Sequence, residues 1–153
     1  MPTPARRPVL YVEDHPVNAL LMAAILERRP ELELLIATTG EEAMCMAAGL
    51  RPALLLLDLG LPDCHGSRLL GLLRALPGCE SVPAVAVTAD VNFPVEDWGF
   101  CELWPKPLNV DEVLARLDAR VGTHPSPPPP LPREVPAQPT QARRVASSVS
   151  GSR

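Results

Sequence analysis

The stretch Leu54-Leu55-Leu56-Leu57-Asp58-Leu59-Gly60-Leu61-Pro62-Asp63-Cys64-His65-Gly66 decides the fold that we predict for this chain. Four consecutive leucines follow Pro52 and precede a segment with glycine and proline, a pattern typical of a short parallel strand buried on both faces. Asp58 ends that strand. An ionised carboxylate is tolerated at such a tip because it can face the crevice where open α/β sheets bind ligands. The stretch therefore predicts a buried strand with a chemically useful carboxylate at its end.

Four more short apolar segments are predicted to be strands, and segments with helical periodicity separate them. The predicted strands cover residues 9–12, 32–37, 84–87 and 101–104. The spacing of apolar residues predicts helices over residues 16–29, 40–48, 66–75 and 109–121. Thr39 with Glu42 has the spacing of a capping box, and Asn109 is placed to cap the last helix. Such alternation predicts right-handed βαβ units and a doubly wound α/β fold, with helices on both faces of a parallel sheet.

Polar side chains lie at the ends of four of the five predicted strands. Glu13 and Asp14 follow the first strand, and Asp58, Thr88 and Lys106 come at or just after the ends of three others. Because parallel strands end at the same edge of a sheet, we expect these side chains to share one crevice. Three clustered carboxylates would repel one another without a hard divalent cation, and Mg²⁺ suits one or two carboxylates together with a phosphoryl oxygen. The sequence therefore predicts a Mg²⁺ site.

This constellation resembles the receiver domain of two-component response regulators, the CheY-like superfamily, over roughly residues 8–121. Pro62 and Gly66 match the loop that follows the acceptor aspartate of that family. Asn18 and the pair Gly99-Phe100 make the chain most similar to the receivers of hybrid sensor kinases. The resemblance implies a five-stranded sheet with the flavodoxin-like strand order 2-1-3-4-5.

The resemblance also implies a role for each of the polar residues at the strand ends. Asp58 would accept a phosphoryl group, and Glu13 and Asp14 would bind Mg²⁺ together with Asp58. Thr88 matches the hydroxyl that contacts the phosphoryl group, and Lys106 matches the lysine that pairs with its oxygens. Independently of the resemblance, Lys106 is the single lysine beside 13 arginines. A compact ammonium on a flexible stem can follow a phosphoryl group, whereas a guanidinium imposes a planar fork.

Two features depart from the pattern of that family. Most receivers have tyrosine or phenylalanine three residues before the lysine, where this chain has Leu103. Trp104 is no direct replacement, because alternation along a strand would point it to the opposite face. Only 18 residues separate Thr88 from Lys106, and Pro94 lies between them, so we expect a shortened fourth helix of a turn or two.

Composition indicates an acidic domain followed by a proline-rich tail. We expect an N-terminal extension over residues 1–7, a receiver domain over 8–122 and a disordered tail over 123–153, which holds 8 of the 20 prolines. Residues 1–121 carry 10 basic and 17 acidic side chains, which argues against direct nucleic-acid binding. The four cysteines form no C-x-x-C pair, so we expect reduced thiols. No apolar run or signal-peptide core indicates membrane insertion or export, so we expect a cytoplasmic protein.

The leading functional hypothesis is a stand-alone receiver that takes a phosphoryl group onto Asp58 from a histidine kinase or phosphotransfer protein. It would signal to an unidentified downstream protein through protein contacts, with at most self-phosphorylation and self-dephosphorylation as enzymatic activity. One alternative is a degenerate receiver that binds a protein partner regardless of phosphorylation, motivated by Leu103 and the short helix. A less favoured alternative is an aspartyl-phosphate hydrolase. Those enzymes usually have Asp-x-Asp, and this chain has Gly60 at the second position.

Overall fold

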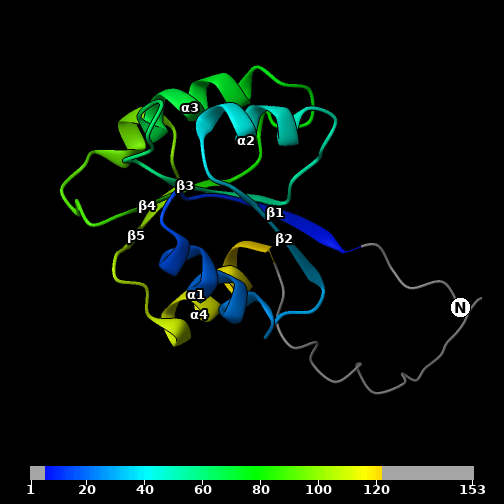
Figure 1. Ribbon diagram of the computed structural model, residues 1–153, viewed down its shortest axis with the longest axis vertical. Helices are drawn as coiled ribbons and strands as arrows, with labels where there is room; N and C mark the ends of the chain where they lie inside the picture. Colours follow the sequence, from blue (N-terminus) through cyan, green and yellow to red (C-terminus); the bar gives the residue numbers. More distant parts are fainter. Residues whose placement is uncertain (1–5, 122–153) are drawn as a thin grey trace, which may run out of the picture. The chain divides into compact units, whose positions relative to one another are not determined.

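Strands and helices alternate along the chain in the computed structural model, which describes residues 6–121 (Figure 1). The elements are β1 (Arg7–Val12), α1 (Pro16–Leu26), β2 (Leu32–Ala37), α2 (Gly40–Ala47), β3 (Leu54–Asp58), α3 (Gly66–Arg74), β4 (Ala84–Thr88), the 3-10 turn η1 (Val95–Trp98), β5 (Glu102–Pro105) and α4 (Val110–Val121). The predicted tail, residues 123–153, and most of the predicted N-terminal extension lie outside the described residues. Within those residues, no helix is both long enough and apolar enough to cross a membrane.

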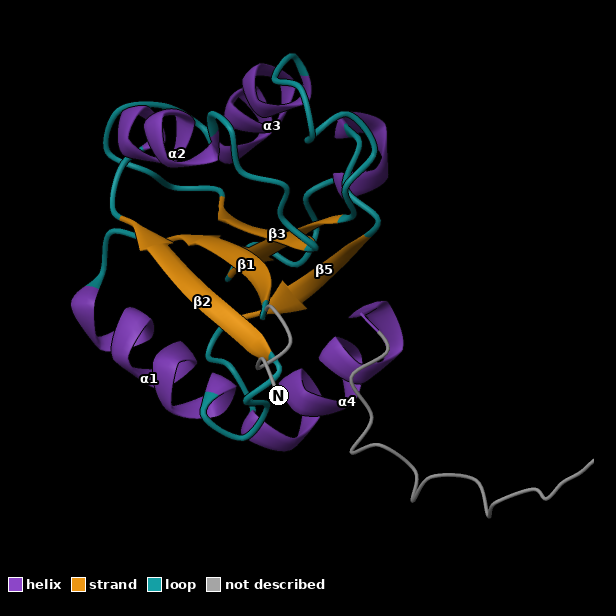
Figure 2. Ribbon diagram, turned by 90° about the vertical axis from the view of Figure 1, so that its right-hand side faces the viewer, coloured by secondary structure: helices purple, strands orange, loops and turns teal. Residues whose placement is uncertain are grey.

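The five strands form one sheet in the order β2-β1-β3-β4-β5, and every neighbouring pair is parallel. Helices α2 and α3 cover one face, while α1 and α4 cover the other (Figure 2). The doubly wound fold and its strand order, both predicted from the sequence, are thus confirmed. In the sheet, Val12 pairs with Leu57, Asp58 with Val87 and Thr88 with Pro105. The carboxyl ends of the four strands that precede the polar residues therefore line up along one edge.

Burial on both faces of the sheet explains why β3 is made of leucine alone before its aspartate. All four leucines are 0% exposed. Leu55 and Leu57 belong to the core cluster under α2 and α3, whereas Leu54 and Leu56 belong to the cluster under α1 and α4. Each fully buried leucine contributes about 1.5–3 kcal/mol through removal of its side chain from water. The strand is therefore held strongly from both sides, and its end is fixed in space.

The caps predicted from sequence form with one change of partner. Asn109 accepts a hydrogen bond from the Glu112 N–H at 2.9 Å, and Thr39 accepts one from the Glu42 N–H at 3.0 Å. The Glu42 carboxylate accepts from the backbone N–H of Thr38 at 2.7 Å, rather than from Thr39 as in a reciprocal capping box. Both helix starts nevertheless have an orphan N–H satisfied by a side chain.

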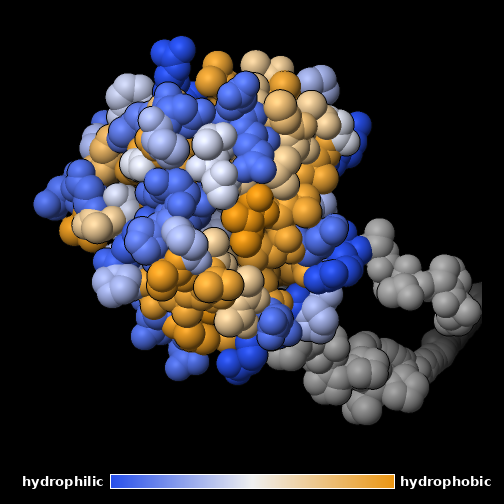
Figure 3. Space-filling model, in the orientation of Figure 1, coloured by the Kyte–Doolittle hydropathy of each residue, from blue (hydrophilic) through white to orange (hydrophobic). Residues whose placement is uncertain are grey.

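Helix α1 buries a different set of residues from the apolar positions that identified it. Met22, Ile25 and Leu26 are buried, whereas Val17 is 63% exposed and Leu20 is 71% exposed. The helix is apolar nearly all round, so periodicity finds the helix but does not select the face that packs on the sheet. Hydrophobic side chains consequently gather on the surface over α1 and α4 (Figure 3).

The segment between β4 and β5 contains a single 3-10 turn, η1, in place of a full helix. Val95 and Phe100 anchor it in the core cluster under α2 and α3. Gly99, with φ of +96°, ends the turn in the left-handed region that glycine adopts without strain. The shortened fourth helix predicted from the chain length is thereby confirmed.

Candidate functional site

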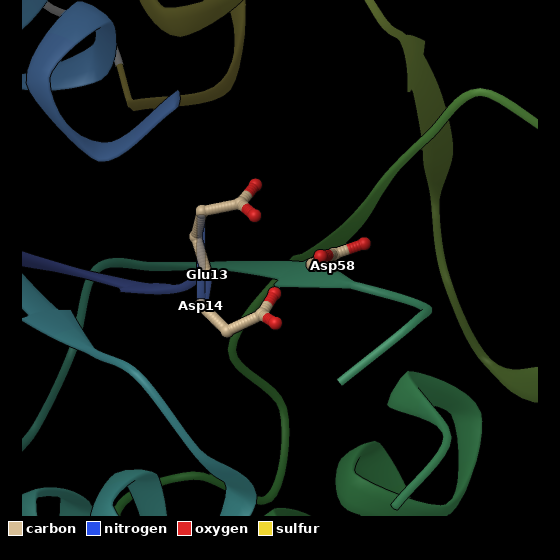
Figure 4. Close-up of side chains that lie close together, drawn as sticks. All are labelled: Glu13, Asp14 and Asp58. Atoms are coloured by element: carbon tan, nitrogen blue, oxygen red, sulfur yellow. The ribbon is translucent and has the colours of Figure 1, made fainter. Parts of the chain in front are cut away.

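The ends of β1 and β3 bring three carboxylates together. One oxygen each from Glu13, Asp14 and Asp58, which we call the acidic cluster, lies within 4.8 Å of the others (Figure 4). Lys106, just after β5, extends its ammonium to within 2.9 Å of Glu13 Oε1 and 3.4 Å of Asp58 Oδ2. The structure thus gathers these four predicted site residues at one place, with Lys106 paired to Glu13 and Asp58, while the roles assigned to them remain predictions.

Thr88 ends β4 beside the acidic cluster, and among residues 6–121 its side chain makes no hydrogen bond to that cluster. The residue is 7% exposed, and its hydroxyl accepts a hydrogen bond from the Asp90 N–H at 3.0 Å. Its carbonyl accepts from the Lys106 N–H at 3.0 Å, which ties the two loops that carry Thr88 and Lys106. Asp58 pairs with Val87 in the sheet, and Thr88 is the next residue of the same strand, β4. Thr88 therefore lies one residue beyond the position level with Asp58.

The adjacent residues Glu13 and Asp14 have opposite surroundings. Their side chains leave the end of β1 on opposite sides, and Glu13 extends toward the side on which α1 lies (Figure 4). Glu13 is 1% exposed, whereas Asp14 is exposed to solvent. Asp14 makes no hydrogen bond or ion pair with any of residues 6–121. The pair therefore supplies one carboxylate that the protein holds and one that is available to a ligand.

Three donors hold the Glu13 carboxylate. The Tyr11 hydroxyl donates to Oε1 at 2.9 Å, the His15 N–H donates to Oε2 at 3.2 Å, and Lys106 pairs with Oε1 at 2.9 Å. Burial would raise the pKa of Glu13, but the bonds from Lys106, Tyr11 and His15 outweigh burial and lower it. Glu13 is therefore ionised in spite of its position in the core.

Asp58 is held less tightly. Burial raises the pKa of Asp58, and the nearby charge of Glu13 raises it further. A hydrogen bond from the Gly60 N–H to Oδ1 at 3.1 Å and the charge of Lys106 act in the opposite direction without cancelling the rise. The pKa values of the two acids shift in opposite directions because Glu13 has bonds from Lys106, Tyr11 and His15, whereas Asp58 has one bond from Gly60 and a more distant Lys106.

The acidic cluster fits a hard divalent cation. Three carboxylates face one ammonium, which leaves an excess of negative charge at the strand ends. Carboxylate oxygens are the ligands that Mg²⁺ prefers, and it keeps several waters when only one or two carboxylates bind it. The exposed Asp14 and the partly accessible Asp58, whose side chain is 10% exposed, leave room for such a hydrated ion. The chemistry of these donors thus agrees with the predicted Mg²⁺ site.

Gly66 lets the loop after Asp58 fold back against β3. Its N–H donates to the Leu59 carbonyl at 2.9 Å, and Gly60 and His65 form an antiparallel bridge in the same loop. A Cβ on Gly66 would lie 2.5 Å from the Asp58 carbonyl oxygen and 2.9 Å from Leu59 Cα. Only glycine fits this close approach without moving the backbone that carries Asp58.

The sequence reasoning missed two contacts, one within the site and one in the loop that follows Asp58. Tyr11 bonds to Glu13, as described above, and the alternation of side chains along β1 was the signal that could have found it. Asp63 caps α2 from the loop after β3, accepting from the Gly40 N–H at 2.8 Å and the Glu41 N–H at 3.0 Å. These bonds lower the pKa of Asp63. No local pattern pointed to Asp63, because its partner helix begins 23 residues earlier.

Leu103 and Trp104 occupy opposite faces of the sheet, as strand alternation predicted. Leu103 is partly buried against the core cluster under α2 and α3. Trp104 is 1% exposed in the cluster under α1 and α4, and its indole N–H donates to Glu102 Oε1 at 2.7 Å. Trp104 therefore has no access to the face on which an aromatic residue at position 103 would lie.

Comparison with known proteins gives consistent results. The family model for the response regulator receiver domain matches residues 9–118. The transcriptional regulatory protein KdpE of Mycobacterium tuberculosis is 36% identical over 117 residues, which are 74% of this chain and 50% of KdpE. The chain thus spans about half the length of that relative. Protein Rrf1 of Nitratidesulfovibrio vulgaris is 30% identical over 79% of this chain and 86% of Rrf1.

Solved structures include a receiver domain that resembles the chain and binds metal. The receiver domain of the sensor histidine kinase PA1611 from Pseudomonas aeruginosa has a magnesium ion coordinated in its active site cleft. It is 26% identical to this chain with a TM-score of 0.70, and the match covers 77% of this chain and 99% of that domain.

Proposed function

Because the chain belongs to the response regulator receiver domain family, we propose that it accepts a phosphoryl group on Asp58 in a Mg²⁺-dependent reaction. The donor would be a sensor histidine kinase or a phosphotransfer protein. The observation that carries this proposal is the position of Asp58, at the end of a strand buried on both faces, 3.4 Å from Lys106 and beside two further carboxylates. A group so fixed can be aligned with an incoming phosphorus atom.

The proposed step is a displacement at phosphorus. A carboxylate oxygen of Asp58 attacks, a new P–O bond forms, and the P–N bond to the donor histidine breaks with its electron pair left on the ring nitrogen. Glu13, Asp14 and Asp58 would hold Mg²⁺, directly or through water, and the ion would neutralise charge on the phosphoryl oxygens. Lys106 would pair with a phosphoryl oxygen, and the Thr88 hydroxyl would contact another.

The downstream signal would pass through protein contacts inside the cytoplasm. Over residues 1–121 the ten basic side chains are outnumbered by 17 acidic ones, which argues against direct binding of nucleic acid. The exposed Val17 and Leu20 of α1 lie near the strand ends and suit an apolar contact with the donor protein. Beyond its own phosphorylation and dephosphorylation, we expect no enzymatic activity from this chain.

The proposal is tested by incubating the full chain with acetyl phosphate and measuring its intact mass. We expect the mass of one phosphoryl group to appear with Mg²⁺ and not with an excess of chelator. Asp58→Asn should abolish the gain, and Asp63→Asn, which changes another carboxylate in the same loop, should retain it. An equal gain in mass in Asp58→Asn would show that Asp58 is not the acceptor.

One alternative has support from the structure. Leu103 and the single turn of η1 remove features that receivers use to transmit phosphorylation, which favours a phosphorylation-independent binding module. Absence of any mass gain in the folded wild-type chain with Mg²⁺ would favour that alternative. The hydrolase hypothesis gains no support, because Gly60 offers Asp58 only a backbone N–H and no carboxyl group for proton transfer.

A further inference from the structure

Tyr11 is a buried polar residue that the proposed reaction does not use. Its residue is 0% exposed, and its ring packs in the core cluster under α1 and α4. Its hydroxyl donates to Glu13 Oε1 at 2.9 Å, the same oxygen that pairs with Lys106 at 2.9 Å.

Tyr11 in β1 and His15 in the following loop restrain the Glu13 carboxylate independently of Lys106. Strand alternation puts Tyr11 and Glu13 on the same face of the sheet, and the His15 N–H holds the other carboxylate oxygen at 3.2 Å. Both oxygens are thus restrained by groups within two residues of Glu13 in the chain. The carboxylate is directed away from Asp14 (Figure 4).

We propose that Tyr11 is a positioning residue, whose hydroxyl holds the Glu13 carboxylate against Lys106. This inference rests on the proposed function and gives Glu13 a role toward Lys106. Glu13, held by Tyr11, sets the place of the Lys106 ammonium beside Asp58.

The substitution Tyr11→Phe separates this role from a structural one, because it removes the hydroxyl and keeps the ring in the core. Glu13 would then have one donor fewer on Oε1 and would be freer to turn toward a cation. We expect Mg²⁺ affinity to stay equal to that of the wild type or to rise. The rate of phosphorylation at saturating Mg²⁺ should fall about tenfold, the scale of a lost hydrogen bond to a charged group. A general loosening of the domain would lower both quantities together.

Val9→Ala is the matched control. Val9 lies on the same strand and in the same core cluster, and its side chain has no polar atom to bond Glu13. The cavity it leaves destabilises β1 without touching the network around Glu13. Mg²⁺ affinity and the phosphorylation rate, measured below the unfolding range, should both remain near the wild-type values.

A second readout is independent of phosphorylation, because the chain contains a single lysine. Selective ¹⁵N and ¹³C labelling of lysine gives one set of side-chain NMR signals, which report the surroundings of Lys106. We expect Tyr11→Phe to shift these signals toward their positions in Glu13→Gln, and Val9→Ala to leave them unmoved.

The outcomes are distinct for the two proposals. Weaker Mg²⁺ binding in Tyr11→Phe, or lysine signals equal to those of the wild type, would overturn the role of Tyr11. A wild-type chain that takes no phosphoryl group would overturn the proposed function instead, and the lysine signals and Mg²⁺ titration would still decide the role of Tyr11.

Discussion

Single atoms set the geometry around Asp58. The hydrogen on the α-carbon of Gly66 points at the backbone of β3, where a methyl group would lie 2.5 Å from the Asp58 carbonyl oxygen. Gly71, in the same helix, has nothing within 4 Å of the place where its Cβ would lie. The two glycines therefore offer a comparison between a position that supports the site and one that does not.

We expect Gly66→Ala to destabilise the fold by about 1–3 kcal/mol, because the backbone of β3 must move to relieve the overlap. Gly71→Ala should instead stabilise by about 0.5–1 kcal/mol, since alanine suits a helix interior better than glycine. Urea denaturation measures both changes. The phosphorylation rate should fall in Gly66→Ala alone. Equal stability and equal rates in the two variants would show that the close approach has no consequence.

Asp14 is expected to contribute more to metal binding than to stability. Asp14→Ala removes an exposed carboxylate without a bond to any of residues 6–121. Loss of a residue that only supports a metal ligand weakens binding by roughly tenfold or more. If Asp14 binds the ion as proposed, its loss should therefore weaken Mg²⁺ binding by at least about that factor. Titration by tryptophan fluorescence measures the midpoint, and Glu96→Ala, which removes an exposed carboxylate from η1, is the control. An unchanged midpoint in Asp14→Ala would remove this residue from the site.

The gathering of the predicted site residues could be inferred from the sequence, because Glu13, Asp14, Asp58 and Thr88 lie at the ends of strands with a strong apolar signal, and Lys106 follows a weaker one. The sequence did not reveal that Glu13 is buried and hydrogen-bonded whereas Asp14 is exposed. This difference in burial depends on the side of β1 from which each side chain extends and on Tyr11, which in the sequence is indistinguishable from an ordinary core residue. Asp63 was missed for another reason, since its bonds join segments 22 and 23 residues apart.

At the scale of elements, strands were more predictable than helix faces. Segments buried on both faces, such as β3 and β4, consist of four apolar residues followed by one polar residue at the last position of the strand. Helix α1 is apolar on nearly every side, so its sequence does not distinguish Met22, which is buried, from Leu20, which is exposed. Only packing against the sheet makes that choice.

An ion-pair network between β5 and α4 should make the stability depend on pH. Glu102 accepts from Arg116 at 3.1 Å and from Arg120, and also from the Trp104 indole at 2.7 Å. Burial acts to raise the pKa of Glu102, but the bonds from Arg120, Trp104 and Arg116 lower it overall. Because the folded-state pKa of Glu102 lies below its unfolded-state pKa, Glu102 stabilises the fold at every pH above the unfolded-state pKa. This stabilisation is lost as the pH falls through the folded-state pKa.

Glu102→Gln should therefore lower the free energy of unfolding at neutral pH by about 1 kcal/mol, a modest figure because the arginines are partly exposed. The difference from the wild type should stay constant down to the usual glutamate pKa of about 4.3 and shrink below it. Urea denaturation across this range gives the measurement, with Glu96→Gln as the exposed control. A difference that persists unchanged at the acid end would contradict the assignment.

Phosphorylation is expected to act on the two loops beside Asp58 rather than on β5. Leu103 provides no aromatic side chain to switch, and η1 has little length over which to shift. Phe93 links the loops, because its ring centroid lies 5.2 Å from that of His65 and 6.4 Å from that of Trp98. Hydrogen exchange with and without beryllium fluoride should show changed protection near residues 59–66 and 88–92. Strong new protection across residues 91–104, with none in the active-site loops, would overturn this expectation.

For the molecule as a whole, the proposed function depends on a single carboxylate. The sheet aligns four strand ends, the core clusters on both faces fix β3, and the loops around it leave Asp58 beside Lys106 and the other acids. Family membership gives the class of reaction, and the geometry gives the residue that would carry it out. The central claim is therefore that the phosphoryl group is attached to Asp58 itself.

Chemical location of the acyl phosphate tests that claim most directly. After incubation of the full chain with acetyl phosphate and Mg²⁺, reduction with tritiated borohydride converts a phosphorylated aspartate to labelled homoserine, and peptide mass spectrometry locates it. The account predicts that the label appears in the peptide containing Asp58, at that position, and only when Mg²⁺ was present. Label at Asp14, at Asp63 or at any other carboxylate, with aspartate intact at position 58, would contradict it.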